Sequence, residues 1–155
     1  MSRIRRNDKN NRIEKTTIHF TNFISQNAVP KAMTLDEIKN ESNNDVTIQA
    51  IRYAIRTNHW HGNPLTAPFI KVRCELSDVD GIIMRGNRIV LPQKLQKKAM
   101  QIAHEGHLGT EKCKSLIRTK LYWPNMSADI ERFVSECIPC KANSRKNAPE
   151  PLHPL

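Results

Sequence analysis

The chain has 155 residues and carries 25 Lys and Arg against 15 Asp and Glu, so its formal net charge is +10. Hydrophobic residues make up 38% and aromatic residues 5% of it, which argues against a single core spanning the whole chain. No apolar run approaches the roughly 20 residues of a membrane helix, and the first residues lack the apolar stretch of a secretory signal. We therefore expect an intracellular protein with a polyanionic partner, nucleic acid before any other.

Residues 1–31 are rich in Lys, Arg and Asn and poor in apolar side chains. Such a composition buries too little apolar surface to offset the entropy of ordering, so it predicts a disordered basic arm. The arm is interpreted as a solvated tail, with contact along phosphates as the alternative.

Residues 32–91 are predicted to be a linker region containing helices and a β-hairpin. A first helix begins at Thr34, which with Glu37 forms a Thr-x-x-Glu capping box. The segment 45–58 has apolar residues at helical spacing and predicts a second helix with a solvated basic face. Its apolar face is formed by Ile48, Ile51 and Ile55, and its solvated face carries Arg52 and Arg56.

Residues 60–68 are rich in turn-forming residues and predict a linker. His59 and His61 flank this segment's first residue and could ligate a metal, but no third ligand is near in sequence. We expect an exposed pair of histidines.

Two short β-rich runs, 81–85 and 88–91, are separated by Gly86 and Asn87, which predicts a hairpin. The preceding Asp78 and Asp80 lack the further ligands of a calcium loop, so a turn is expected.

Residues 92–142 are predicted to form a small helical unit, and 143–155 a proline-rich extended tail. A helix starting at Pro92 should run to His104, and glycines then interrupt it. A second helix is expected over 110–121 and a third from Ser127 into Cys137. The fold class is therefore mainly α. The second helix is expected to bury Cys113, Leu116, Ile117 and Leu121.

Two pairs of metal-binding residue types stand within this unit. His104 and His107 are separated by two residues, and Cys137 and Cys140, also two apart, begin 30 positions after His107. Imidazole nitrogens and thiolates are the ligands of closed tetrahedral zinc sites. A unit of this size with few large apolar side chains needs such a staple to fold. We predict one structural Zn²⁺, with Cys113 a rival ligand that is assigned instead to the core.

Catalytic interpretations of these residues fit the sequence less well than a structural zinc site. The segment from His104 to His107 is a near miss for the His-Glu-x-x-His motif of metalloproteases, which needs its histidines four positions apart and an open zinc position. The cysteine pair alone could be a redox pair, but its partnership with two histidines favours zinc. No phosphate-binding loop, nucleotide fingerprint or serine-nucleophile elbow occurs. We expect neither catalysis nor a small-molecule substrate.

Residues 103–146, with their two-His, two-Cys motif and the signatures Gly-His-Leu-Gly and Tyr-Trp-Pro, resemble the zinc-binding N-terminal domain of gypsy-type LTR retrotransposon integrases. The segment 71–95 is similar to the stretch just upstream of that domain, and the resemblance covers roughly residues 34–146. It maps His104, His107, Cys137 and Cys140 onto the family's zinc ligands. The sequence departs from the pattern in its short His-to-His gap and at Cys113, where these elements often have Thr.

The resemblance implies a zinc-held helical bundle that supports integrase multimerisation and contacts the DNA ends of the element. In this family, strand transfer uses two Asp and one Glu on a separate catalytic core, while reverse transcriptase and RNase H regions lie upstream. The expectation is a noncatalytic fragment of such a polyprotein, acting in the nucleus or in a cytoplasmic retroelement particle. The alternative is a domesticated host zinc-finger adaptor that binds a protein partner.

Basic residues near the predicted zinc unit fall into two groups that could converge on a DNA-binding patch. The alternative is that they only keep the unit soluble. The first group is Lys112, Lys114, Arg118 and Lys120, and the second is Lys141, Arg145 and Lys146.

Overall fold

The computed structural model describes residues 33–146, and the predicted basic arm and the tail from residue 147 lie outside the described part. The described part is mostly helical with one four-stranded sheet, which confirms the mainly α expectation. The α-helices are α2 (Leu35–Asn44), α3 (Val46–Thr57), α4 (Gln93–His104), α5 (Thr110–Arg118), α6 (Met126–Ser135) and α7 (Ile138–Lys146). A 3₁₀ helix, η1 (Ala67–Glu75), precedes the strands β1 (Leu76–Val79), β2 (Ile82–Arg85), β3 (Arg88–Val90) and β4 (Leu121–Tyr122). No helix among residues 33–146 is long and apolar enough to cross a membrane.

Side-chain caps fix the starts of the first two helices. The hydroxyl of Thr34 accepts a hydrogen bond from the Glu37 amide at 3.1 Å, as the capping-box pattern predicts. One carboxylate oxygen of Asp45 caps α3 by accepting from the amides of Thr47 and Ile48 at 2.8 and 3.1 Å. The other oxygen accepts from the amide of Gln93, the first residue of α4, at 2.8 Å. Asp45 therefore ties the start of α3 to the start of α4 through a contact with a residue 48 positions further along the chain.

The sheet has the strand order β1-β2-β3-β4. The hairpin of β2 and β3 is confirmed, and Gly86 in its turn has a positive φ of 57°. β1 forms a second hairpin with β2 that the sequence analysis missed, although Asp80 and Gly81, with φ of 51° and 81°, form a turn of the favoured Asp-Gly kind. β4 comes from the segment after α5 and pairs in parallel with β3, with Leu121 opposite Ile89.

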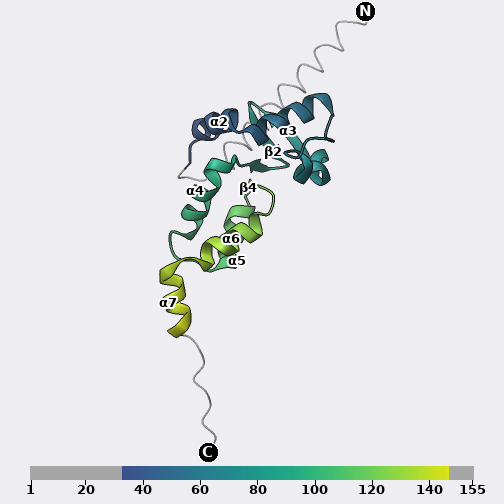
Figure 1. Ribbon diagram of the computed structural model, residues 1–155. Coiled ribbons are helices and arrows are strands. Elements are labelled where there is room, and N and C mark those ends of the chain that lie inside the picture. The colour runs from purple at the N-terminus through teal and green to yellow at the C-terminus, as the bar shows by residue number, and fades with distance from the viewer. Residues whose placement is uncertain (1–32, 147–155) are drawn as a thin grey trace, which may run out of the picture.

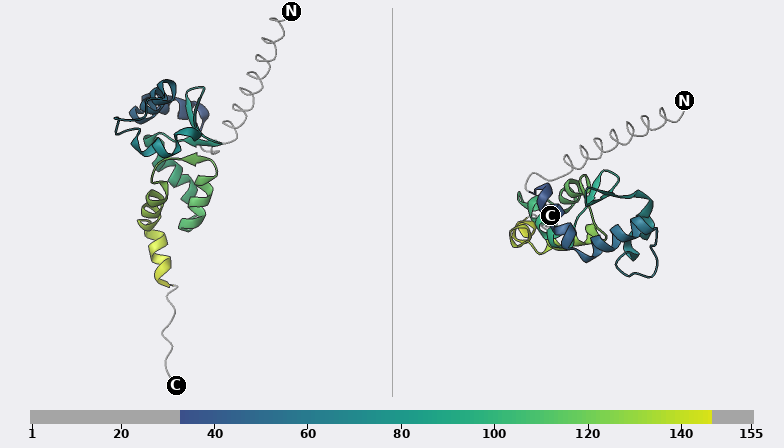
Figure 2. Two further views of the ribbon diagram at one scale, coloured as in Figure 1. Left: turned by 90° about the vertical axis from the view of Figure 1, so that its right-hand side faces the viewer. Right: turned by 90° about the horizontal axis from the view of Figure 1, so that it is seen from above.

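Two buried clusters lie on opposite faces of this sheet. Ile82, Met84 and Ile89 pack with buried residues of α2, α4, α5 and α6 on one face. On the other face, Ile83 and Val90 pack with α3, η1 and Trp60. This division follows the alternation of side chains along a strand. In Figures 1 and 2, α3 and η1 accordingly lie at one end of the molecule, α5 and α6 at the other, and α7 projects from the second end.

Several sequence-based expectations need correction. Trp60, placed in a linker, is only 5% exposed because it packs against α3 in the second cluster. The predicted helix over 110–121 ends at Arg118, since Leu121 joins the sheet, and Leu116 is 52% exposed rather than buried. Residues 143–146, assigned to an extended tail, are the last turn of α7.

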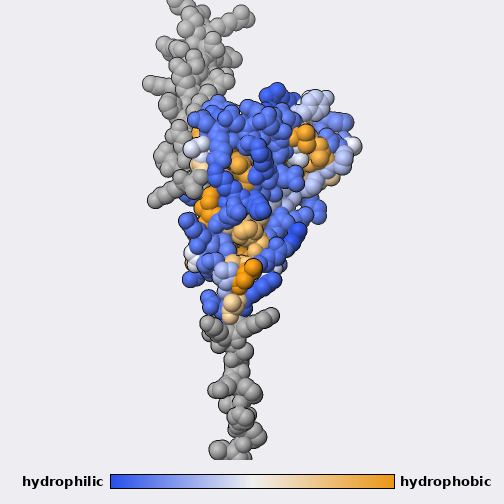
Figure 3. Space-filling view, turned by 60° about the vertical axis from the view of Figure 1, so that its left-hand side comes forward, coloured by the Kyte–Doolittle hydropathy of each residue, from blue (hydrophilic) through white to orange (hydrophobic). Residues whose placement is uncertain are grey.

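Hydrophilic side chains cover most of the face shown in Figure 3, and apolar residues appear there only in a narrow band and in small patches. Asp78, considered as part of a calcium loop, instead forms ion pairs with Arg52 at 3.3 Å and with Arg56 at 3.8 Å. It also accepts a hydrogen bond from the Gly81 amide, so it stabilises the turn as expected.

Candidate metal centre

Helix α4 and the loop after it position the two histidines. His104 is the last residue of α4, and the amide of His107 donates to the His104 carbonyl at 2.8 Å, which closes a tight turn. His107 adopts a positive φ of 50° in this turn. The two imidazole rings consequently meet edge to face, with centroids 5.3 Å apart. The short gap between the histidines therefore allows both rings to bind the same metal ion.

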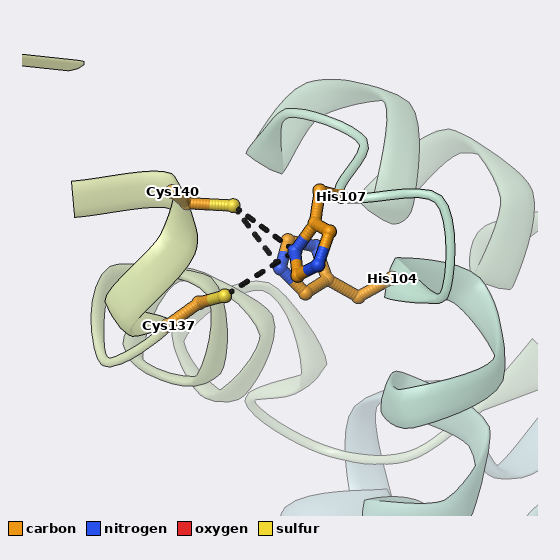
Figure 4. Close-up of side chains that lie close together, drawn as sticks. All are labelled: His104, His107, Cys137 and Cys140. Atoms are coloured by element: carbon orange, nitrogen blue, oxygen red, sulfur yellow. Dashed lines mark hydrogen bonds between the residues drawn. The ribbon is translucent and has the colours of Figure 1, made fainter. Parts of the chain in front are cut away.

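The two cysteines lie at the start of α7. Cys137 directly precedes the helix and its carbonyl accepts from the amide of Lys141, while Cys140 stands in the first turn. This turn places the thiols of Cys137 and Cys140 on the same side of α7. Figure 4 shows both sulfur atoms directed toward the imidazole rings of His104 and His107.

The four side chains form a compact set of ligand atoms. The Cys137 and Cys140 sulfurs lie 3.4 and 3.6 Å from Nδ1 of His107, and the Cys140 sulfur lies 3.4 Å from Nε2 of His104. All four ligand atoms lie within 4.8 Å of one another. Tetrahedral zinc with bonds of about 2.0–2.3 Å places its ligand atoms roughly 3.3–3.8 Å apart. The donor set and its spacing are thus consistent with one zinc ion.

His104 is oriented by a hydrogen bond on its outer nitrogen. Its Nδ1 donates to the carbonyl of Leu108 at 3.0 Å, which leaves the lone pair of Nε2 facing the Cys140 sulfur. The ring is 6% exposed and packs edge to face against Phe133. Such a bond fixes both tautomer and ring orientation in metal sites. No sequence motif marks this hydrogen bond, because its acceptor is a backbone carbonyl.

Cys113 lies beside this site but outside the four-residue group. Its sulfur lies 3.4 and 3.3 Å from the carbonyl oxygens of Ala103 and Leu108, either of which can accept its single proton. It is 3.6 Å from Nδ1 of His104, whereas the Cys140 sulfur approaches the other ring nitrogen, Nε2. The side chain is 1% exposed, and burial raises the pKa of its thiol. Both observations fit the core role expected for Cys113.

The pKa of Cys140 is also raised, first by burial and then by its neighbour Cys137. A bound zinc ion supplies positive charge that stabilises the thiolate forms of such ligands. No other group of three or more potential metal ligands occurs among residues 33–146, and His59 and His61 are exposed as expected.

The basic residues singled out from the sequence have different surroundings. Lys114 is buried and pairs with the carboxylates of Glu111 and Glu131, so it links α5 to α6. Arg118 is exposed and donates to the Ser127 hydroxyl at 2.6 Å. The remaining ones are Lys112 and Lys141, which are exposed, Lys120, which is half-buried, and Arg145 and Lys146, which lie in the last turn of α7.

Comparison with known proteins shows which family the residues around this cluster resemble. Residues 91–146 match the model of the integrase zinc binding domain, and the matched range contains all four residues of the cluster. This part of the chain is an integrase zinc-binding domain. The two histidines and two cysteines of the cluster are residue types that bind zinc, in agreement with that description.

Two curated relatives extend the similarity beyond the zinc-binding domain. An uncharacterized protein of Caenorhabditis elegans is 30% identical over 125 residues, which are 79% of this chain and 10% of that protein. The gypsy retrotransposon integrase-like protein 1 of Bos taurus is 26% identical over 108 residues, 67% of this chain and 19% of that protein. The chain therefore spans less than a fifth of the length of either relative. No solved structure matches it.

Proposed function

We propose that the chain acts as a noncatalytic zinc-binding module of a retrotransposon integrase, supporting DNA binding and multimerisation during DNA integration. The observation that carries this proposal is the four-residue cluster within the domain that matches the integrase family. The proposed ligands of one structural Zn²⁺ are His104, His107, Cys137 and Cys140. Four protein ligands complete a tetrahedral site and leave no open position for a catalytic water.

The proposed domain organisation places the zinc-binding unit at residues 92–142, with the upstream helices and hairpin packed against it. The strand-transfer chemistry would reside on a separate catalytic core of a larger integrase polyprotein that also carries reverse transcriptase and RNase H activities. The small share of its relatives that the chain spans supports this proposal. An intracellular location, in the nucleus or a retroelement particle, follows from the same proposal.

For DNA contact, we retain the basic residues of the two groups except Lys114, which we set aside. The two carboxylates that pair with Lys114 already satisfy its charge. The proposed phosphate-contacting residues are Lys112, Arg118, Lys120, Lys141, Arg145 and Lys146. The net charge of +10 supports such a role, since phosphate neutralisation dominates nucleic-acid affinity.

Reversing charge on α5 tests the DNA proposal. The double substitution Lys112→Glu and Arg118→Glu should weaken binding to a short DNA duplex by at least about tenfold at low salt. It should also reduce the slope of log affinity against log salt by about two, because two phosphate contacts are lost. Fluorescence anisotropy over a salt series measures both quantities, with zinc content and helicity checked in parallel.

The matched control reverses two lysines on other elements, Lys39→Glu on α2 and Lys97→Glu on α4. Neither lysine forms an ion pair within residues 33–143, and both changes alter net charge by the same amount. If the control pair weakens duplex binding as much as the α5 pair, only overall charge matters and α5 is not the DNA-facing surface.

A host adaptor that binds a protein partner is the second candidate. Exposed apolar side chains support it: Ile138 at the start of α7 is 79% exposed and Leu116 on α5 is 52% exposed. These same side chains could serve self-association in the first candidate. Salt separates the candidates, since duplex affinity falls steeply with salt while an apolar protein contact barely responds.

A further inference from the structure

One end of the sheet carries two arginines directly opposite each other. Arg85 on β2 and Arg88 on β3 are cross-strand partners, so their side chains emerge on the same face, the one that carries Val90 and Tyr122. Like charges in this arrangement destabilise a sheet unless other groups offset them. The groups around the two guanidinium groups therefore decide whether this repulsion is offset.

Tyr122 offsets part of this repulsion. The guanidinium carbon of Arg85 lies 4.3 Å from the centre of the Tyr122 ring, and that of Arg88 lies 5.5 Å from it. Both distances fall within the range of cation–π attraction. The ring is held in place edge to face against Phe69, with centroids 6.3 Å apart. The aromatic ring thus fixes both arginines at the surface.

Among the described side chains, only Arg85 of these two arginines forms a close ion pair with a carboxylate, although Arg88 also contributes to lowering the pKa of the same residue, Glu75. Glu75 accepts two hydrogen bonds from Arg85, at 2.9 and 3.2 Å, and this bidentate pair satisfies much of its charge. Within residues 33–143, Arg88 forms no ion pair and its side chain forms no hydrogen bond to a protein acceptor. Arg88 therefore presents a positioned guanidinium whose donors are available to a ligand.

Lys120 adds a second positive charge at the same place. The Ile89 amide donates to the Lys120 carbonyl at 2.9 Å, which puts Lys120 alongside Arg88 where β4 pairs with β3. Lys120 is the turn residue directly before β4, and its side chain is half-buried. Lys120 likewise forms no ion pair within the described side chains.

We infer that Arg88, Lys120 and Tyr122, here called the arginine–tyrosine surface, bind the phosphate backbone of duplex DNA. This inference rests on the proposed function and extends it to a hairpin residue upstream of the family-matched segment. Arg88 and Lys120 act as phosphate donors, while Tyr122 and Arg85 position the Arg88 side chain. Backbone contacts of this kind give affinity without base specificity.

The surface is a composite of two segments that are distant in sequence. Arg85 and Arg88 belong to the hairpin, whereas Lys120 directly precedes strand β4 and Tyr122 ends it, between α5 and α6 of the zinc-binding domain. The pairing of β3 with β4 assembles them. Duplex binding at this surface therefore requires the zinc-binding domain to be docked on the hairpin.

The test uses the full chain with zinc bound and a short duplex of mixed sequence. Arg88→Gln should weaken binding by about three- to tenfold at low salt and reduce the salt slope by about one, as expected for one lost phosphate contact. Arg88→Lys, which keeps the charge, should retain most of the affinity. Lys120→Gln should reduce the duplex affinity and the salt slope by similar amounts. Because it is a second, independent variant, a folding defect in Arg88→Gln alone would be recognised. The matched control is Lys97→Gln on α4, which packs against the opposite face of the sheet.

Three outcomes are decisive. A loss with Arg88→Gln that Arg88→Lys restores, and that Lys97→Gln does not reproduce, supports the inference. If the wild-type protein and the α5 variants behave as the proposed function expects but Arg88→Gln matches Lys97→Gln, the arginine–tyrosine surface is excluded while the proposed function stands. If the wild-type protein does not bind duplex at all, the proposed DNA role and this inference fail together.

Discussion

Removing zinc with a chelator is expected to unfold α7 and the loop between α4 and α5 while the sheet and its helices stay folded. Helix α7 projects from the body of the molecule (Figure 2). Its described side chains up to residue 143 are exposed except for the half-buried Cys140. Cys137 and Cys140 are thus its main attachment to the rest of the chain. The first buried cluster includes no residue of α7 and joins α4, α5 and α6 to α2 and the sheet. We therefore expect it to persist without the metal, although the size of the 92–142 unit alone predicted that this unit needs zinc to fold.

Hydrogen exchange followed by mass spectrometry measures this directly. Protection should be lost over residues 105–109 and 137–143 and retained in β2, β3 and α4. If free zinc exceeds its dissociation constant about a thousandfold, its removal lowers the free energy of unfolding by about 4 kcal/mol. The apparent melting temperature should fall accordingly.

The variants of this experiment identify the ligands. Cys137→Ser combined with Cys140→Ser should abolish stoichiometric zinc binding and reproduce the exchange pattern of the chelated protein. Cys74→Ser, at an exposed cysteine outside the cluster, should keep one zinc per chain. Full zinc retention in the double variant would contradict the proposed ligand set.

Asp45→Ala is expected to lower the free energy of unfolding by about 2–3 kcal/mol, more than the loss of an ordinary helix cap. A single capping residue contributes roughly 0.5–2 kcal/mol. Asp45 uses one oxygen for the start of α3 and the other for the first amide of α4. Chemical denaturation monitored by circular dichroism measures the change.

Asp45→Asn is the informative comparison. Its amide oxygen can still cap α3, but its amide nitrogen cannot accept from the Gln93 amide, so about half of the loss should remain. Equal stability of the Asn variant and the wild-type protein would show that the contact with α4 contributes nothing. Equal losses in the Asn and Ala variants would show that the cap on α3 contributes nothing.

Local signals account for what the sequence predicted correctly. The Thr34 cap, the helix over 46–57 and the turn at Gly86 depend on residues within a few positions of one another. The metal cluster was predictable for another reason. Its four residues are of types that commonly bind metals and the spacing within each pair is short, so the sequence alone marks them as a candidate metal site.

Features that depend on distant contacts were not predictable in the same way. The two-residue strand β4 exists only because β3 is present to pair with it, and no alternation pattern can mark so short a segment. Lys114 has the sequence surroundings of a surface lysine, and only the approach of Glu131 from α6 buries it. Trp60 stands among turn-forming residues, yet α3 provides the cluster that covers it.

The strand pairing between β3 and β4 sets the smallest fragment that can be isolated in a well-behaved form. A fragment limited to the family-matched residues 91–146 would lack β3, and β4 would present an unpaired edge. It would also uncover Leu121 and Ile117, which in the whole chain pack in one cluster with Ile38, Met84 and Ile89. Unpaired edges and newly exposed apolar side chains drive aggregation. Biophysical work on the zinc site is therefore best done on a fragment that starts before α2, at residue 33 or earlier.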